Sequence, residues 1–168
     1  AAKESGNDIK KFIKDADMVF VCAGLGGGTG TGSAPVVAQM AKETGAIVIG
    51  TVTMPFEIER ARVDKAEFGL QQLREECDTV IVIDNNRLVN IAGNLPIQQA
   101  FAVANELIST MIKGIVETIA VPSLVNLDYA DVRAIMTNGG VAAIGVGSSD
   151  TNNRVDEAVK GALANPLL

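Results

Sequence analysis

A glycine-rich stretch between two apolar segments most constrains what this chain can fold into. It reads AGLGGGTGTGSAP from Ala23 to Pro35. The apolar run at 18–22 before it is typical of a buried strand in a parallel sheet, and apolar residues recur at helical spacing after it. We therefore predict a strand, a glycine loop and a helix over 33–44, with Ser33 able to cap the helix and Pro35 in its first turn.

The loop has the chemistry of a phosphate cradle. Glycine lets the backbone approach an anion closely, successive N–H groups can form a concave nest, and the helix dipole adds positive potential at the same place. The alternative is a turn needed only for tight strand–helix packing, but six glycines interleaved with two threonines exceed what such a turn requires. The candidate phosphate-binding residues are Gly26, Gly27, Gly28, Thr29, Gly30 and Thr31.

The two common phosphate-loop patterns do not fit this stretch. A Walker A loop needs a lysine after its last glycine, whereas Ser33 follows Gly32. A dinucleotide fingerprint, G-x-G-x-x-G, that starts at Gly24 or Gly26 has a threonine at its last glycine position. The string GGGTGTG from Gly26 to Gly32 instead resembles the signature loop of the FtsZ/tubulin family of GTPases.

Composition limits the classes of protein to consider. The chain has 168 residues, enough for one good core and one or two domains, and its 48% hydrophobic content with few aromatic residues suits an α/β protein. A net charge of −6 without a basic block argues against nucleic acid or an anionic membrane as the main partner. The two cysteines fit no metal spacing and are typical of reduced cytosolic thiols. We expect no membrane insertion, because no apolar run is long enough to span a bilayer. The chain begins with alanine, from which we expect it to be a piece of a longer protein.

The rest of the chain alternates helical and strand patterns. Another buried strand after the first helix predicts a right-handed βαβ unit over 17–53. The long segment 97–119 is apolar on most faces and predicts a buried helix. We predict helices over 4–14, from within 54–62 to about 76, over 97–119, 129–138 and about 152–164, and strands over 17–23, 46–53, 78–83 and 141–147.

The loop after the second strand also resembles the family. Family members carry Pro-Phe-x-x-Glu followed by an arginine there, which corresponds to Pro55, Phe56, Glu59 and Arg62. The resemblance implies that Glu59 accepts hydrogen bonds from the ribose hydroxyls and that Arg62 lies near the sugar or the phosphates. This chain has one residue fewer between the two, and Arg60 stands where the family has glycine. Taken alone, the loop also fits a capped helix start with a solvated salt bridge.

Three further residues, in two segments, resemble the guanine-binding residues of the family. The purine-contacting asparagine of the loop after strand 78–83 corresponds to Asn85, which we favour over its neighbour Asn86. On the long helix, Phe101 and Asn105 lie four residues apart and hence on one face. The resemblance implies that Phe101 stacks on the purine and that Asn105 pairs with the guanine edge, although an isolated phenylalanine of this kind is more often ordinary core.

The second strong match is Asn126-Leu127-Asp128-Tyr129-Ala130-Asp131. By spacing alone, Asp128 is a helix N-cap and Asp131 an acidic residue of the first turn. The stretch also resembles the synergy loop of the family, whose carboxylates enter the nucleotide pocket of the next subunit. Asp128 and Asp131 would then orient and polarise the water that attacks the γ-phosphate, with help from Asn126.

Together these matches imply an α/β fold with a three-layer, mostly parallel sheet flanked by helices, as in the tubulin-like, Rossmann-type domains. Residues 1–119 would be the GTPase domain without its first strand and first phosphate loop, with its core helix at about 97–119. Residues 120–168 would begin the C-terminal activation domain. The FtsZ type fits better than the eukaryotic tubulins, and the sequences at 59–62 and 84–87 are closer to archaeal members.

The resemblance implies a cytoplasmic cell-division GTPase at the division site. It would bind GTP or GDP with Mg²⁺ on the phosphates and would assemble head-to-tail into filaments, since a heterologous contact does not close. Membrane-anchor and other division proteins would bind regions outside this chain. One alternative is a dinucleotide-binding oxidoreductase, but Thr53-Met54-Pro55 stands where an acidic residue is expected. The other is a nucleotide-binding filament protein without GTPase activity, which would lack the Asp128/Asp131 pair.

Overall fold

The structure, a computed structural model, describes residues 2–87, 96–121, 128–137, 139–143 and 145–164. The chain divides into two compact units. The first unit comprises Ala1–Asp84 and Val132–Ala142, and the second unit comprises Asn85–Asp131 and Ala143–Leu168. The predicted division into domains at residues 119 and 120 stays a prediction.

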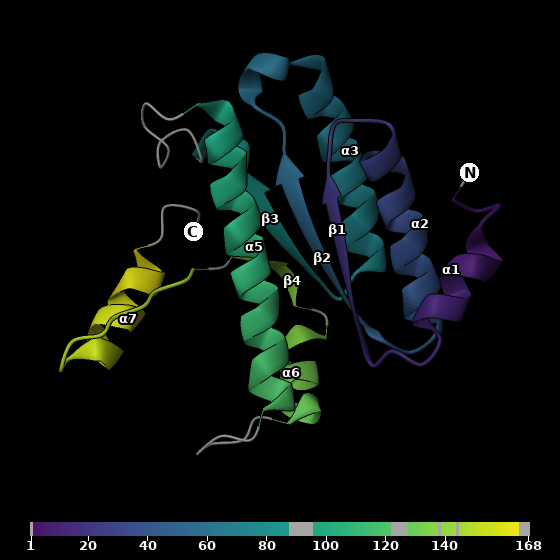
Figure 1. Ribbon diagram of the computed structural model, residues 1–168. Coiled ribbons are helices and arrows are strands. Elements are labelled where there is room, and N and C mark those ends of the chain that lie inside the picture. The colour runs from purple at the N-terminus through teal and green to yellow at the C-terminus, as the bar shows by residue number, and fades with distance from the viewer. Residues whose placement is uncertain (1, 88–95, 122–127, 138, 144, 165–168) are drawn as a thin grey trace. The chain divides into compact units, whose positions relative to one another are not determined.

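A parallel sheet of four strands forms the centre of the first unit (Figure 1). Its strands lie in the order of the sequence: β1 (Met18–Gly24), β2 (Ile47–Met54), β3 (Thr79–Asp84) and β4 (Gly140–Ala142). Gly24 pairs with Thr53 at the carboxyl ends of β1 and β2. The loops that follow these two strands therefore emerge at the same edge of the sheet, where parallel α/β folds bind their ligands.

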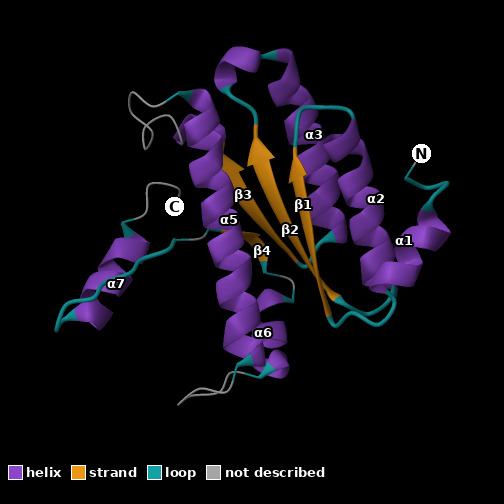
Figure 2. Ribbon diagram, viewed as in Figure 1, coloured by secondary structure: helices purple, strands orange, loops and turns teal. Residues whose placement is uncertain are grey.

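Helices cover one face of this sheet (Figure 2). They are α2 (Thr29–Glu43) and α3 (Ala61–Glu76), with a short 3₁₀ turn, η1 (Glu57–Glu59), before α3, while α1 (Gly6–Ile13) packs against α2. Val48, Val52 and Leu73 are completely buried between strand and helix. Each such side chain stabilises the fold by about 1.5–3 kcal/mol through the hydrophobic effect. The predicted α/β fold with a parallel sheet is confirmed.

The start of α2 differs from the prediction. The helix begins at Thr29 rather than at residue 33, so Pro35 lies inside it and not in its first turn. Its first hydrogen bond runs from the Gly32 N–H to the Gly28 oxygen at 3.1 Å. Ser33 does not cap the helix, because its hydroxyl donates back to the Thr29 carbonyl at 2.7 Å. The second half of the glycine stretch is therefore helical.

The second unit contains the long helix α5 (Ile97–Ala120) and α7 (Arg154–Leu163), and α6 (Tyr129–Met136) begins in it. The predicted length of α5 is confirmed. Among its described side chains only Met111 is buried, and Phe101 is 40% exposed. The predicted burial of this helix between two layers stays a prediction.

The remaining predicted elements are mostly shorter in the structure. The strand predicted over 141–147 is β4 with only three residues, and residues 145–147 are outside any strand. The sequence also predicts a short helical turn through Leu88 and Ile91, which lies outside the described residues. No helix in the described part of the chain is long and apolar enough to cross a membrane.

Candidate nucleotide-binding site

The loop between β1 and α2 contains two glycines at which any Cβ would press on neighbouring backbone. Gly26 has φ +96°, and a Cβ there would lie 2.9 Å from the Arg62 carbonyl oxygen and 3.2 Å from Pro55 Cγ. A Cβ on Gly30 would overlap the carbonyl oxygen of Gly24. The first turn of α2 therefore packs directly on the end of β1, and the loop packs on the segment that follows β2.

The threonines complete the loop. The Thr31 hydroxyl accepts a hydrogen bond from the Gly26 N–H at 2.9 Å and closes the turn from inside. The hydrogen bonds of α2 begin only at Gly32, so the amide groups of Thr29, Gly30 and Thr31 have no acceptor within the helix. Such free amides at a helix N-terminus favour an anion. Phosphate binding by this loop stays a prediction.

A shallow hollow of about 390 Å³ adjoins the loop. Its lining combines the loop with the first turns of α3: Gly27, Gly28, Thr31, Gly32, Asp64, Lys65 and Phe68. Sequence reasoning missed Gly32 and the three residues of α3. Phe68 lies four residues after Asp64 and three after Lys65, so both pairs are neighbours on the helix surface, and this spacing just after a recognised motif was the signal that could have found them.

Glu59 and Arg62 are brought together beside this loop. Glu59 Oε2 accepts a hydrogen bond from Arg62 Nη1 at 2.7 Å, and Glu59 Oε1 accepts one from the Phe56 N–H at 3.1 Å. The Glu59 side chain is 26% exposed and that of Arg62 is 65% exposed. The structure thus contains the salt bridge and the capped helix start that the spacing predicted. The ribose contact of Glu59 and the phosphate contact of Arg62 stay predictions.

Arg60, between these two residues, has a strained backbone. Its φ of +34° is the only positive value outside glycine in the described part of the chain. Side chains with a Cβ rarely adopt this region, whereas glycine adopts it freely. The glycine that the family has at this position would therefore be relaxed here. In this chain the turn between Glu59 and Arg62 is made by an arginine, whose Cβ disfavours this φ.

The predicted purine-contacting residues belong to the second unit. Asn85 follows β3 directly and is only 7% exposed, and its Oδ1 has no hydrogen-bond partner among the described residues. A buried amide oxygen without a partner is costly, and the purine contact predicted for Asn85 stays a prediction. Phe101 and the exposed Asn105 lie one turn apart on α5, as predicted.

Asp128 and Asp131 cap the start of α6 reciprocally. The Asp131 N–H donates to Asp128 Oδ1 at 2.9 Å, and the Asp128 N–H donates to Asp131 Oδ2 at 3.3 Å. Both side chains are exposed. The cap predicted from the spacing is present, and it holds the two carboxylates next to each other. Asn126, the third predicted catalytic residue, lies outside the described residues.

Neither cysteine has the properties of a nucleophile. Burial raises the pKa of Cys77 to about 12, with the nearby Asp78 carboxylate as a second cause. Cys22 is exposed, and partial desolvation raises its pKa against the lowering effect of a hydrogen bond with Thr51. Both thiols are therefore protonated near neutral pH, and covalent thiol chemistry has no reactive group here. The described residues contain no group of three or more histidine, cysteine, aspartate or glutamate residues that could hold a metal ion.

Comparison with known proteins gives a consistent result. The model of the tubulin/FtsZ family, GTPase domain, matches residues 1–93. The chain is 59% identical over 171 aligned residues to cell division protein FtsZ 2 of Methanocaldococcus jannaschii and covers 45% of that protein. It is 55% identical over its whole length to cell division protein FtsZ 2 of Halobacterium salinarum and covers 43% of it. Both relatives are archaeal, as the loop sequences indicated.

The fold agrees with these relatives. The structure of an empty FtsZ dimer of M. jannaschii matches all of this chain with a TM-score of 0.93 and 51% sequence identity, over 49% of that chain. A CetZ protein of Methanosaeta thermophila, 24% identical, matches 95% of this chain with a TM-score of 0.79 and shares the fold. The chain spans less than half the length of the curated relatives it matches.

Proposed function

Since the chain belongs to the tubulin/FtsZ family, we propose that it carries most of the nucleotide site of a self-assembling GTPase. The observation that carries this proposal is the glycine cradle. Gly26 and Gly30 stand where any Cβ would clash, and the amides of the first turn of α2 have no acceptor within the helix. The site fits the phosphate chain of GTP or GDP, because phosphate oxygens are the acceptors that such amides lack.

The sugar and the base would be bound by residues from the following loops and from α5. Glu59 would accept hydrogen bonds from the ribose hydroxyls, and Arg62 would lie near the sugar or the phosphates. The unpartnered Oδ1 of Asn85 supports a purine contact, since a guanine ring offers N–H donors and no described residue satisfies this oxygen. Phe101 would stack on the purine, and Asn105 would pair with its edge.

Hydrolysis would require a second subunit. Asp128 and Asp131 would enter the nucleotide pocket of the next molecule and orient the attacking water, with Asn126 beside them. The reciprocal cap supports this role because it uses one oxygen of each carboxylate and fixes both side chains to the helix start. A head-to-tail contact of this kind does not close, so the assembly grows as a filament.

Magnesium would enter the site with the nucleotide. Mg²⁺ is usually held by substrate phosphates and waters with only one or two protein oxygens. The exposed hydroxyl of Thr29, at the start of α2 beside the cradle, is one oxygen that fits this need. When bound, the ion would neutralise charge on the phosphates.

The cellular role follows the names of the relatives, which are cell division proteins. We place this protein in a cytoplasmic filament at the division site, with partner proteins bound by segments outside this chain. An oxidoreductase is not favoured, because β2 ends at Thr53-Met54 without an acidic residue for a ribose. A filament protein without GTPase activity is not favoured either, because the Asp128/Asp131 pair is present.

Binding of GTP to a cradle variant tests the proposal. In the full-length protein, Gly30→Ala should lower GTP affinity by at least about tenfold, because its Cβ would push α2 away from the end of β1. Gly114→Ala on α5 is the matched control, since its Cβ would meet no atom within 4 Å. Isothermal titration calorimetry with GTP measures the GTP affinity of each of the two variants. Equal affinities in the two variants would contradict the proposed cradle.

A further inference from the structure

The carboxylate proposed to receive the ribose already has partners in this structure. Glu59 Oε2 is bound by Arg62 Nη1 at 2.7 Å, and Oε1 is bound by the Phe56 N–H at 3.1 Å. Only the first of these partners is a charged, mobile side chain. The Phe56 amide is fixed in the backbone, whereas Arg62 is 65% exposed and can leave without disturbing the core.

The backbone that carries the pair cannot move as easily. The Arg62 carbonyl and Cβ lie 2.9 Å and 3.1 Å from where a Cβ on Gly26 would be, so this turn is pressed against the phosphate loop. Arg60 holds its unfavourable φ of +34° between the two paired residues. The pair must therefore open by rotation of the Arg62 side chain, at the cost of one partly exposed ion pair.

We infer that Arg62 masks Glu59 in the free protein and thereby selects nucleotides against nucleosides. The inference rests on the proposed function, in which Glu59 accepts the ribose hydroxyls. A nucleoside must compete with Arg62 for Glu59 and offers the guanidinium nothing in return. A nucleotide brings phosphate oxygens, which are good partners for a displaced guanidinium. Selectivity then arises because a nucleoside bears the whole free-energy cost of breaking the Glu59–Arg62 ion pair, whereas a nucleotide recovers part of that cost through its phosphates.

Guanosine binding to the full-length protein tests the inference, with Arg62→Gln as the main variant. This variant should bind guanosine about two- to fivefold more tightly than the wild type, as expected for removal of one partly exposed ion pair. Its affinity for GTP should not rise, so the ratio of GTP to guanosine affinity should fall. With 2′,3′-dideoxyguanosine, which lacks the competing hydroxyls, the variant should show no gain.

Lys11→Gln is the matched control. Lys11 forms an ion pair of the same three-residue spacing with Asp8 on α1, at 3.0 Å. Its loss should leave guanosine affinity unchanged. In a protein that already carries Glu59→Gln, adding Arg62→Gln should also leave guanosine affinity unchanged, because the carboxylate that Arg62 masks is absent. Circular dichroism and thermal melting check that each variant is folded.

Ionic strength gives a second readout that needs no variant. Salt weakens an exposed ion pair and does not act on neutral guanosine. The wild type should therefore bind guanosine more tightly as salt rises, and Arg62→Gln should not. If the wild type binds GTP but Arg62→Gln shows no gain for guanosine, this inference is overturned and the proposed function stands. If the wild type binds neither ligand, the proposed function itself is overturned.

Discussion

Asp128 and Asp131 accept each other's backbone N–H groups, at 2.9 Å and 3.3 Å, at the first turn of α6. This contact explains why two carboxylates stand so close on an exposed helix end. Each cap bond uses one oxygen of its carboxylate. Helix capping and catalysis are therefore compatible roles for the same two residues.

Arg60→Gly should stabilise the protein. The change relieves a non-glycine φ of +34°, which costs of the order of 1 kcal/mol or more, and the entropy that glycine loses on folding offsets part of the gain. We expect a net increase of about 0.5–1 kcal/mol in the unfolding free energy, measured by urea denaturation. Arg74→Gly, inside α3, should instead destabilise by about 1 kcal/mol. A loss of stability in Arg60→Gly would show that this φ carries no strain.

Cys77 should make stability fall at alkaline pH. Burial raises its pKa to about 12, above the value of 9.0 expected when unfolded. A thiol that holds its proton more tightly in the folded state stabilises the protein fully below pH 9.0, and this contribution is lost as the pH rises toward 12. The unfolding free energy should therefore decline over this window, and less steeply in Cys77→Ala. Identical pH profiles would exclude a raised thiol pKa.

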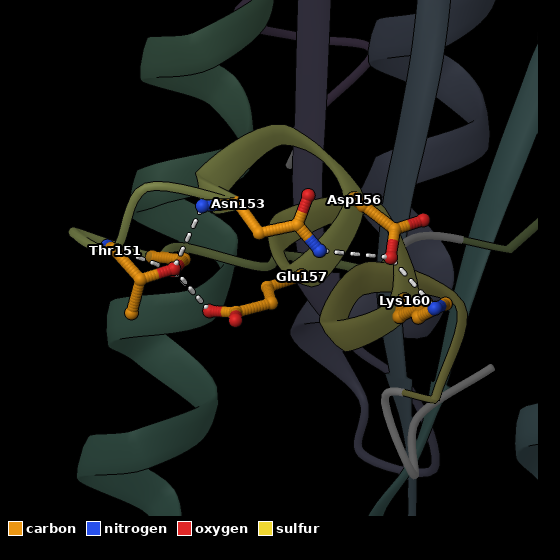
Figure 3. A network of polar contacts seen from close by, with 6 residues as sticks. Thr151, Asn153, Asp156, Glu157 and Lys160 are labelled. Carbon is orange, nitrogen blue, oxygen red and sulfur yellow. Dashed lines mark hydrogen bonds and ion pairs between the residues drawn. The ribbon is translucent and has the colours of Figure 1, made fainter.

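Glu157 should titrate at unusually low pH. Its Oε2 accepts hydrogen bonds from the Ser149 hydroxyl at 2.6 Å and the Thr151 hydroxyl at 2.8 Å, which lower its pKa (Figure 3). This contribution to stability is present above the unfolded pKa and is lost as pH falls through the folded one. Ser149→Ala combined with Thr151→Ala should raise the pKa toward 4.5, measured by NMR titration of the carboxyl carbon. Lys160→Gln, which removes the ion pair with Asp156, is the control that should leave Glu157 unchanged.

Much of the first unit could be predicted from sequence because its signals are local. Buried parallel strands produce continuous apolar runs, and β1, β2 and β3 lie where those runs stand. The Asp128/Asp131 cap and the Glu59–Arg62 pair also follow from spacing of three residues. Each of these predictions depends on neighbours along the chain, which a sequence displays directly.

The features that could not be predicted depend on contacts between distant segments. Ser33 and Pro35 are typical of a helix start, yet α2 begins earlier because Gly30 can pack against the Gly24 carbonyl. The strain at Arg60 lies in the turn whose next residues, at Arg62, press on Gly26 of the β1–α2 loop. The unpartnered Oδ1 of Asn85 likewise depends on what surrounds it in space.

GTP hydrolysis as a function of protein concentration tests the central claim most directly. The full-length wild type should be compared with Asp128→Asn and Asp131→Asn, because asparagine can still cap the helix but lacks the carboxylate charge. Specific activity of the wild type should rise steeply above a threshold concentration. Both variants should bind GTP and assemble but hydrolyse it at least about tenfold more slowly, as expected for loss of groups that position the attacking water. Activity that is linear in concentration and equal in all three proteins would contradict a site shared between subunits and leave the two aspartates as helix caps.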